Sequence, residues 1–146
     1  MAGSNAGMNG DITSVTTLFV YGTLMRGEAN HARFCADALT IEPAVTTGRL
    51  YHLPMGFPAM IEADDGQVFG EAMTFPDLDA VLRPTDFLEG YDPRRPDSSM
   101  YRRIAVPVLI DGSEQCVTAW TYVWNRPLPH GATLLPTGRW RDHGSR

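Results

Sequence analysis

Runs of apolar residues predict several short strands in the first half of the chain. Segment 16–21, TTLFVY, is β-branched, aromatic and almost continuously apolar, which is typical of a central strand rather than an edge strand. Segments 44–53 and 59–75 also have strand-like patterns, and the second contains Asp65-Gly66, a strong hairpin signal. We therefore expect antiparallel pairing of the strands on either side of that dipeptide.

The later part of the chain contains another predicted strand pair. Segments 101–110 and 116–124 alternate apolar and polar residues and flank Asp111-Gly112, which predicts a second hairpin. The tail from Asn125 onward is rich in proline and glycine, so we expect it to be mostly irregular.

Two segments have the composition or period of helices. Segment 28–39 is rich in good helix formers and contains Asn30, a candidate N-cap, so it predicts a helix of about three turns. In 76–91, Pro84 predicts a break after which the helix restarts, and Gly90 predicts its end. This order of elements is typical of an α+β fold whose strands can curl into a barrel.

The composition favours one domain. With 146 residues, of which 43% are hydrophobic, we expect a single domain over 15–146, behind a small, polar and glycine-rich segment, 1–14, that reads as a flexible leader. The net charge of -5 argues against a nucleic-acid partner. No apolar run reaches the roughly 20 residues of a membrane span, and no targeting pattern is seen, which predicts a cytoplasmic protein without a membrane partner.

The usual signatures of metal, nucleotide and nucleophile chemistry are missing. Cys35 and Cys116 lie far apart, outside any C-x-x-C pair, and are expected to be buried thiols. The histidines lack the spacing of metal ligands, and no phosphate-binding loop, dinucleotide fingerprint or nucleophile elbow occurs. We therefore expect neither a metal nor another cofactor.

Glu89 is the first candidate for chemistry. Its neighbours in FLEGY are apolar, aromatic or small, which places a carboxylate beside apolar surface. Desolvation would raise its pKa above the usual value and make it a better proton shuttle near neutral pH. The alternatives are a solvated residue at a helix end or an ion-pair partner of Arg102 or Arg103, and the residue types alone leave these open.

The turn after the first strand is the second candidate. Its glycine, Gly22, permits unusual dihedral angles and leaves backbone N–H groups uncovered, which suits a carboxylate or an oxyanion. The alternative is a tight turn that serves only the topology.

Several stretches taken together resemble the γ-glutamylcyclotransferase-like family of AIG2-type proteins. They are VYGTLMRGEANHARF, GRLYHLPMGFPAM, VFGEAMTF, FLEGYDP, MYRRIAVPV, AWTYVW and a late TGRW, and they cover about residues 17 to 140. The resemblance implies a small, mixed, mostly antiparallel β-barrel with a few short peripheral helices. It also implies that Glu89 is the catalytic acid/base, and that substrate is bound by a further set of residues: Tyr21, Gly22, Thr23, Leu24 and Tyr101.

The function that the resemblance implies is γ-glutamyl cyclotransfer. The α-amine of a small γ-glutamyl amine or amide would attack its own γ-carbonyl group and release 5-oxoproline and a free amine, without a cofactor. The alternatives are a non-catalytic protein that binds a γ-glutamyl metabolite, and a γ-glutamyl hydrolase or transferase. The sequence identifies neither the leaving amine nor the oligomeric state.

The chain departs from the family pattern at three places. Thr85-Asp86, behind Pro84, stands where many relatives have leucine-aspartate, so the helix that carries Glu89 could be reset. The insertion 92–100 is either a lid that sets leaving-group preference or plain surface. Arg139 replaces a common aspartate in the tail, which leaves the role of the tail open.

Other polar and aromatic residues receive structural interpretations. Glu71 is expected to point outward or to form a salt bridge rather than to face the pocket. Solvated or structural pairing is expected for Arg49, Arg102 and Arg103, and core or pocket-wall positions for Tyr51, Trp120 and Trp124.

Overall fold

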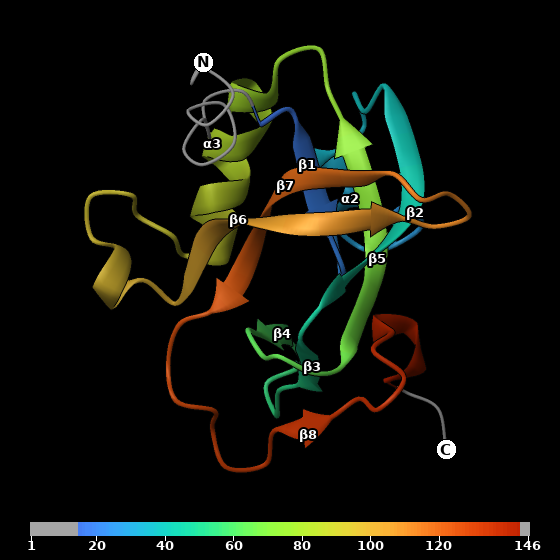
Figure 1. Ribbon diagram of the computed structural model, residues 1–146. Helices are drawn as coiled ribbons and strands as arrows, with labels where there is room; N and C mark the ends of the chain where they lie inside the picture. Colours follow the sequence, from blue (N-terminus) through green and yellow to red (C-terminus); the bar gives the residue numbers. More distant parts are fainter. Residues whose placement is uncertain (1–14, 144–146) are drawn as a thin grey trace, which may run out of the picture.

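Five strands close into a barrel with the order β1-β5-β2-β6-β7 (Figure 1). The computed structural model describes residues 15–143, so the predicted leader, 1–14, lies outside the described residues. The barrel strands are β1 (Thr17–Val20), β2 (Thr40–Thr47), β5 (Gln67–Thr74), β6 (Tyr101–Ile110) and β7 (Cys116–Trp124). β1 pairs antiparallel with β5 and parallel with β7, and the other neighbours are antiparallel. The predicted mixed, mostly antiparallel barrel and the central position of the first strand are confirmed.

A separate three-stranded sheet lies at one end of the barrel (Figure 1). It contains β3 (Arg49–His52), β4 (Pro58–Ile61) and β8 (Thr133–Leu134), in the order β4-β3-β8. The chain passes from the barrel into this sheet at Gly48, which lies between β2 and β3, and returns to the barrel at Gly66.

The hairpin predicted at Asp65-Gly66 is therefore wrong. β4 pairs with β3, whereas β5 pairs with β1 and β2, so the strands on either side of this turn belong to different sheets. The turn lies where the outgoing and returning chains cross: the Gly48 N–H donates to the Gly66 carbonyl oxygen at 3.2 Å. A Cβ on Gly66 would lie 2.5 Å from the Gly48 carbonyl oxygen, so glycine is required there by close approach as well as by its φ of 84°. The second predicted hairpin, at Asp111-Gly112, is confirmed by the antiparallel pairing of β6 and β7.

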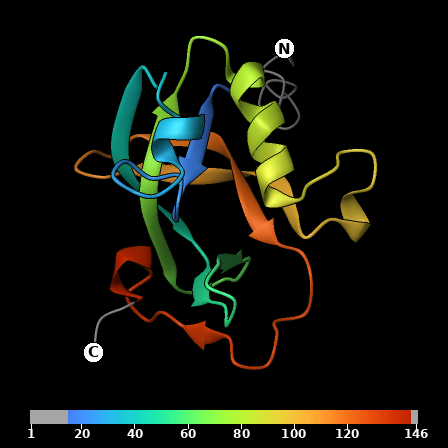
Figure 2. The same ribbon diagram turned by 180° about the vertical axis from the view of Figure 1, so that it is seen from behind.

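Two helices lie outside the barrel wall (Figure 2). The first, α2 (His31–Phe34), is only four residues long, and the prediction of three turns is wrong. The chain leaves the helix at Cys35, and the Leu39 N–H donates to the Thr74 carbonyl oxygen at 2.7 Å, so pairing with the end of β5 replaces further helical turns. Tertiary pairing overrides helix propensity here.

The second helix, α3 (Leu78–Glu89), is continuous through Pro84, so the predicted break is wrong. Asp77 caps its first turn by accepting from the Ala80 N–H, and Val81, Leu82, Thr85 and Asp86 are buried. Burial of this face offsets the hydrogen bond that proline removes. Gly90 ends the helix in the left-handed conformation, as predicted, with φ of 69°. No helix of the described part of the chain is long and apolar enough to cross a membrane.

The core fills the barrel, and the tail folds against it. Leu18, Phe19, Met73 and Val108 are among its fully buried side chains. The tail is mostly irregular, as predicted, but Trp140 in the short helix η3 (Trp140–Asp142) is buried. A second short helix, η2 (Pro96–Ser98), lies between α3 and β6.

The two cysteines have different environments. Cys35 is a buried thiol, as predicted, and its burial raises the pKa to about 11. Cys116 is exposed, so the prediction that it is a buried thiol is wrong. It is the first residue of β7 after the hairpin turn, outside the buried part of the strand.

Candidate active site

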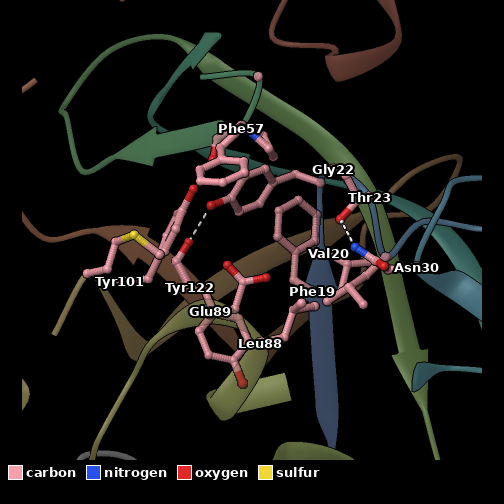
Figure 3. A pocket seen from close by; sticks show the side chains of 15 residues that line it. Phe19, Val20, Gly22, Thr23, Asn30, Phe57, Leu88, Glu89, Tyr101 and Tyr122 are labelled. Atoms are coloured by element: carbon pink, nitrogen blue, oxygen red, sulfur yellow. Dashed lines mark hydrogen bonds between the residues drawn. The ribbon is translucent and has the colours of Figure 1, made fainter. Parts of the chain in front are cut away.

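The six residues proposed from the sequence line one cavity of about 340 Å³ (Figure 3). They are Tyr21, Gly22, Thr23, Leu24, Glu89 and Tyr101. The turn comes from the end of β1, Glu89 from the end of α3, and Tyr101 from the start of β6. Most of the cavity wall is apolar, with Phe19, Val20 and Leu88 among the lining residues.

The turn from Tyr21 to Leu24 packs tightly against β4. A Cβ on Gly22 would lie 2.5 Å from Cγ of Pro58. Gly22 does not have a positive φ, so glycine is required here by space and not by the unusual dihedral angles that we expected. The hydrogen bonds among the described residues include none donated by the backbone N–H groups of Gly22, Thr23 or Leu24. These three consecutive N–H groups of cavity-lining residues are therefore candidate donors to a ligand.

Asn30 fixes the shape of this turn. Its side-chain amide donates to Oγ1 of Thr23 at 2.9 Å, and its backbone N–H donates to the Thr23 carbonyl oxygen at 2.8 Å. Asn30 is the N-cap residue of α2, as predicted, but its side chain makes no capping hydrogen bond because it binds Thr23 instead. It also lines the cavity, which its helix-forming sequence context did not indicate.

Glu89 directs its carboxylate into the cavity (Figure 3). Desolvation raises the pKa of Glu89 to about 7. The apolar environment comes from residues distant in sequence, such as Phe19 and Val20, whereas the neighbouring Phe87 is 89% exposed. A carboxylate at the C-terminal end of α3 is also disfavoured by the helix dipole. The side chain is therefore poised to gain or lose a proton near neutral pH.

The alternative interpretation of Glu89, an ion pair with Arg102 or Arg103, is not found among the described residues. Arg103 binds Asp86 instead, with hydrogen bonds of 2.8 and 3.1 Å from Nε and Nη2 to the two carboxylate oxygens. The guanidinium also lies 4.6 Å from the ring centroid of Trp120. Arg103 is therefore paired with Asp86 and not with Glu89.

Tyr122 joins this ion pair to the cavity wall. Its hydroxyl donates to Oδ1 of Asp86 at 2.5 Å and lies 2.7 Å from Oγ1 of Thr85. Sequence reasoning missed Tyr122 as a cavity residue. Its position between two core residues of a predicted strand gave no signal that distinguished it from the rest of the core.

Two further tyrosines hold the walls of the cavity together. The Tyr101 hydroxyl donates to the Pro58 carbonyl oxygen at 2.5 Å, and the Tyr21 hydroxyl donates to the Tyr122 carbonyl oxygen at 2.6 Å. Burial raises the pKa of both phenols, and the nearby charge of Glu89 raises it further. Both side chains therefore stay neutral and act as hydrogen-bond donors.

The other polar candidates lie away from this cavity. Glu71 is buried, and its Oε1 accepts from the Arg26 backbone N–H at 2.7 Å, so the expected outward position or salt bridge is wrong. Arg49 pairs with Asp65, as expected, at the surface. Arg139 lies 4.0 Å from the ring centroid of Phe69 and lines a second, smaller hollow.

The expected core or wall positions of three aromatic residues are confirmed. Trp124 is buried, and Tyr51 and Trp120 are partly buried against the core. In the insertion 92–100, Met100 lines the cavity, while the Asn125 side chain binds the carbonyl oxygens of Pro96 and Ser99. The described residues contain no group of three or more metal-ligating side chains.

The sequence and the fold were compared with known proteins. The chain is 32% identical over 109 residues to the gamma-L-glutamyl-butirosin B gamma-glutamyl cyclotransferase of Niallia circulans, covering 75% of this chain and 67% of that one. It is 27% identical over 128 residues to YkqA of Bacillus subtilis, covering 86% of this chain but only 41% of YkqA. The YkqA crystal structure superimposes with a TM-score of 0.63 over 88% of this chain and 40% of that chain.

Further matches agree with the fold and the family. A mouse AIG2-like protein has a similar fold, with a TM-score of 0.60 and 23% identity over 78% of this chain and 84% of that chain. The family model described as "Gamma-glutamyl cyclotransferase, AIG2-like" matches residues 18–142. The chain therefore belongs to the AIG2-like gamma-glutamyl cyclotransferase family.

Proposed function

We propose that this protein is a γ-glutamyl cyclotransferase that converts a small γ-glutamyl amine or amide into 5-oxoproline and a free amine. The observation that carries the proposal is the position of Glu89: its carboxylate, with a pKa of about 7, points into a cavity whose rim offers three unpaired backbone donors. Membership of the family supports the same reaction.

The first requirement of the reaction is a folded substrate. The N–H groups of Gly22, Thr23 and Leu24 are the available donors for the α-carboxylate of a γ-glutamyl group. With that end bound, the α-amine can approach the γ-carbonyl carbon of the same molecule. Holding two reacting groups in such geometry is worth up to about 7 to 11 kcal/mol of the barrier. The nucleophile belongs to the substrate, so the protein need not provide one.

The second requirement is the movement of two protons from the α-nitrogen to the leaving nitrogen. The ionised Glu89 accepts one proton from the α-ammonium group, and the freed nitrogen attacks the γ-carbonyl carbon to form the ring. Glu89 gives this proton to the leaving nitrogen as the bond between that nitrogen and the carbon breaks. It then takes the second proton from the ring nitrogen and passes it to the released amine, which departs as an ammonium ion. A carboxylate of pKa about 7 serves both steps because neither protonation state is strongly favoured. The reaction balances without a cofactor.

The test is an assay of 5-oxoproline with a panel of γ-glutamyl amides. We expect product with the wild-type protein and a loss of about 100-fold or more in kcat for Glu89→Gln, which keeps the size of the side chain but cannot carry the proton. Glu114→Gln, an exposed glutamate on the β6–β7 turn, is the matched control and should retain full turnover.

Two other outcomes would replace this proposal. Glutamate instead of 5-oxoproline among the products would indicate hydrolysis. Thermal stabilisation by γ-glutamyl compounds without any product would indicate a binding protein. Full turnover by Glu89→Gln would contradict the assigned role of Glu89.

A further inference from the structure

The charges around the cavity limit what the released amine can be. Glu89 is the only charged side chain among the described residues that line the cavity. Arg103 of β6 is bound to Asp86 of α3. Arg94 and Arg95 of the insertion are exposed and do not line the cavity. A substrate with a second carboxylate would find no cation to receive it.

The phenol hydroxyls of the cavity all donate to protein atoms. The hydroxyls of Tyr101, Tyr21 and Tyr122 donate to the oxygens of Pro58, Tyr122 and Asp86, respectively. Oγ1 of Thr23 accepts from the Asn30 side chain. The donors left for a ligand lie on the turn side of the cavity: the three N–H groups of the turn, the hydroxyl hydrogen of Thr23 and the second amide hydrogen of Asn30. In the proposed reaction the γ-glutamyl group occupies that side.

The cavity wall away from the turn is apolar. Figure 3 shows Phe57 and Tyr101 across the cavity from Thr23 and Asn30, with the Glu89 carboxylate between the two sides. Phe57 is 44% exposed at the mouth and is fixed by a tight turn, in which the Leu53 N–H donates to the Phe57 carbonyl oxygen at 2.9 Å. Leu88 and Met100 also line the cavity and are only partly buried.

These observations assign a class to the leaving group. We infer that the amine released by this protein is uncharged and apolar beyond its reacting nitrogen, and that it packs against Phe57, Leu88 and Met100. The inference rests on the proposed cyclotransferase function. A carboxylate on that side would lose its water without gaining a partner. The one possible partner of an ammonium group, Glu89, already serves the α-ammonium group of the substrate in the proposed reaction. An alkyl or aryl group would instead bury apolar surface. The cavity thus selects against charged amines as well as for apolar ones.

Matched pairs of substrates test the inference. γ-Glutamylphenethylamide and γ-glutamylphenylalanine differ by one carboxylate, and γ-glutamylpentylamide and γ-glutamylcadaverine differ by one ammonium group. We expect kcat/KM for 5-oxoproline release to favour the uncharged member of each pair by about tenfold or more. Equal rates within both pairs, or a preference for the charged members, would overturn the inference.

Two arginine variants locate the selectivity. Phe57→Arg adds a cation at the cavity mouth and should shift the ratio of the phenethylamide to the phenylalanine substrate toward phenylalanine by about tenfold. Phe87→Arg adds the same cation at an exposed position outside the cavity and should leave that ratio unchanged. An unchanged ratio in Phe57→Arg, or an equal shift in both variants, would contradict the placement of the leaving group.

A binding measurement separates this inference from the proposed function. Thermal shifts are recorded with the same two pairs of compounds on Glu89→Gln, which holds substrate without turnover. If no compound yields 5-oxoproline with the wild-type protein, the cyclotransferase proposal fails. Larger shifts with the uncharged members would still support an apolar cavity, and equal shifts would reject it.

Discussion

The carboxylate of Asp86 holds both Nε and Nη2 of Arg103, at 2.8 and 3.1 Å. Asp86 lies three residues before Glu89 in α3, so two acidic residues of one helix end have opposite environments. Asp86 receives the cation and the Tyr122 hydroxyl, while Glu89 receives neither. The pairing of one carboxylate thus leaves the other free to take up a proton.

Asp86→Asn should destabilise the protein by about 3 kcal/mol, because the guanidinium of Arg103, which is mostly buried, then lacks its partner. Urea unfolding at neutral pH measures the change. The matched control is Asp65→Asn, which breaks the surface pair with Arg49 and should leave the unfolding midpoint almost unchanged. Similar effects of the two substitutions would mean that the buried pair contributes no more to the free energy of unfolding than the surface pair does.

The rate of cyclisation should depend on the ionisation of Glu89. Its raised pKa of about 7 predicts that kcat/KM rises with pH and levels off above that value, because only the ionised carboxylate accepts a proton. Initial rates from about pH 5.5 to 8.5 measure the profile. A rate that does not change across neutral pH would mean that another group controls the reaction.

The same pKa predicts a cost in stability. Glu89 binds a proton more tightly in the folded chain than in the unfolded one, where its pKa is about 4.3. The resulting stabilisation is complete below the unfolded pKa and is lost as the pH rises through about 7. Glutamine does not titrate. The free energy of unfolding of Glu89→Gln, relative to that of the wild type, should therefore increase by roughly 3 kcal/mol as the pH rises from the lower to the higher of those two values.

Urea unfolding of both proteins at about pH 4 and pH 8.5 tests this gain. Other titrating groups cancel in the difference between variant and wild type. Glu114→Gln, an exposed substitution, should show no such trend. A difference that stays constant over the whole range would argue against a raised pKa at Glu89.

Gly22→Ala should impair binding and catalysis through Pro58. The new methyl group would lie 2.5 Å from Cγ of Pro58, whose carbonyl oxygen accepts from Tyr101. A displacement of this wall should lower kcat/KM by about 100-fold, since misplacement by about 1 Å has effects of that size. The added substitution Pro58→Ala removes Cγ and should restore part of the loss. Wild-type kinetics in Gly22→Ala would show that the turn tolerates a side chain.

Local patterns in the sequence predicted much of the barrel. The apolar run of β1 and the Asp-Gly turn between β6 and β7 need only neighbouring residues to be recognised. The turn after β1, Glu89 and Tyr101 were grouped through resemblance to a family, and they line one cavity. Their roles in catalysis stay predictions.

Other features depend on partners distant in the sequence. Nothing near Asp65-Gly66 indicates that β4 joins β3 and β5 joins β2, because that choice is made between sheets. The short α2 reflects the pairing of Leu39 with Thr74. The Asp86–Arg103–Tyr122 network joins α3, β6 and β7, and no spacing along the chain reveals such a cluster.

The parallel seam between β1 and β7 also constrains how the protein is made. Thr17 and Leu18 lie opposite Ala119 and Trp120, so β1 leaves the ribosome well before the partner strand that it needs. Until then, one edge of β1 stays open to other nascent chains. A release of the polypeptide before Cys116 would leave that edge permanently unprotected and the cavity that contains Glu89 without Tyr122.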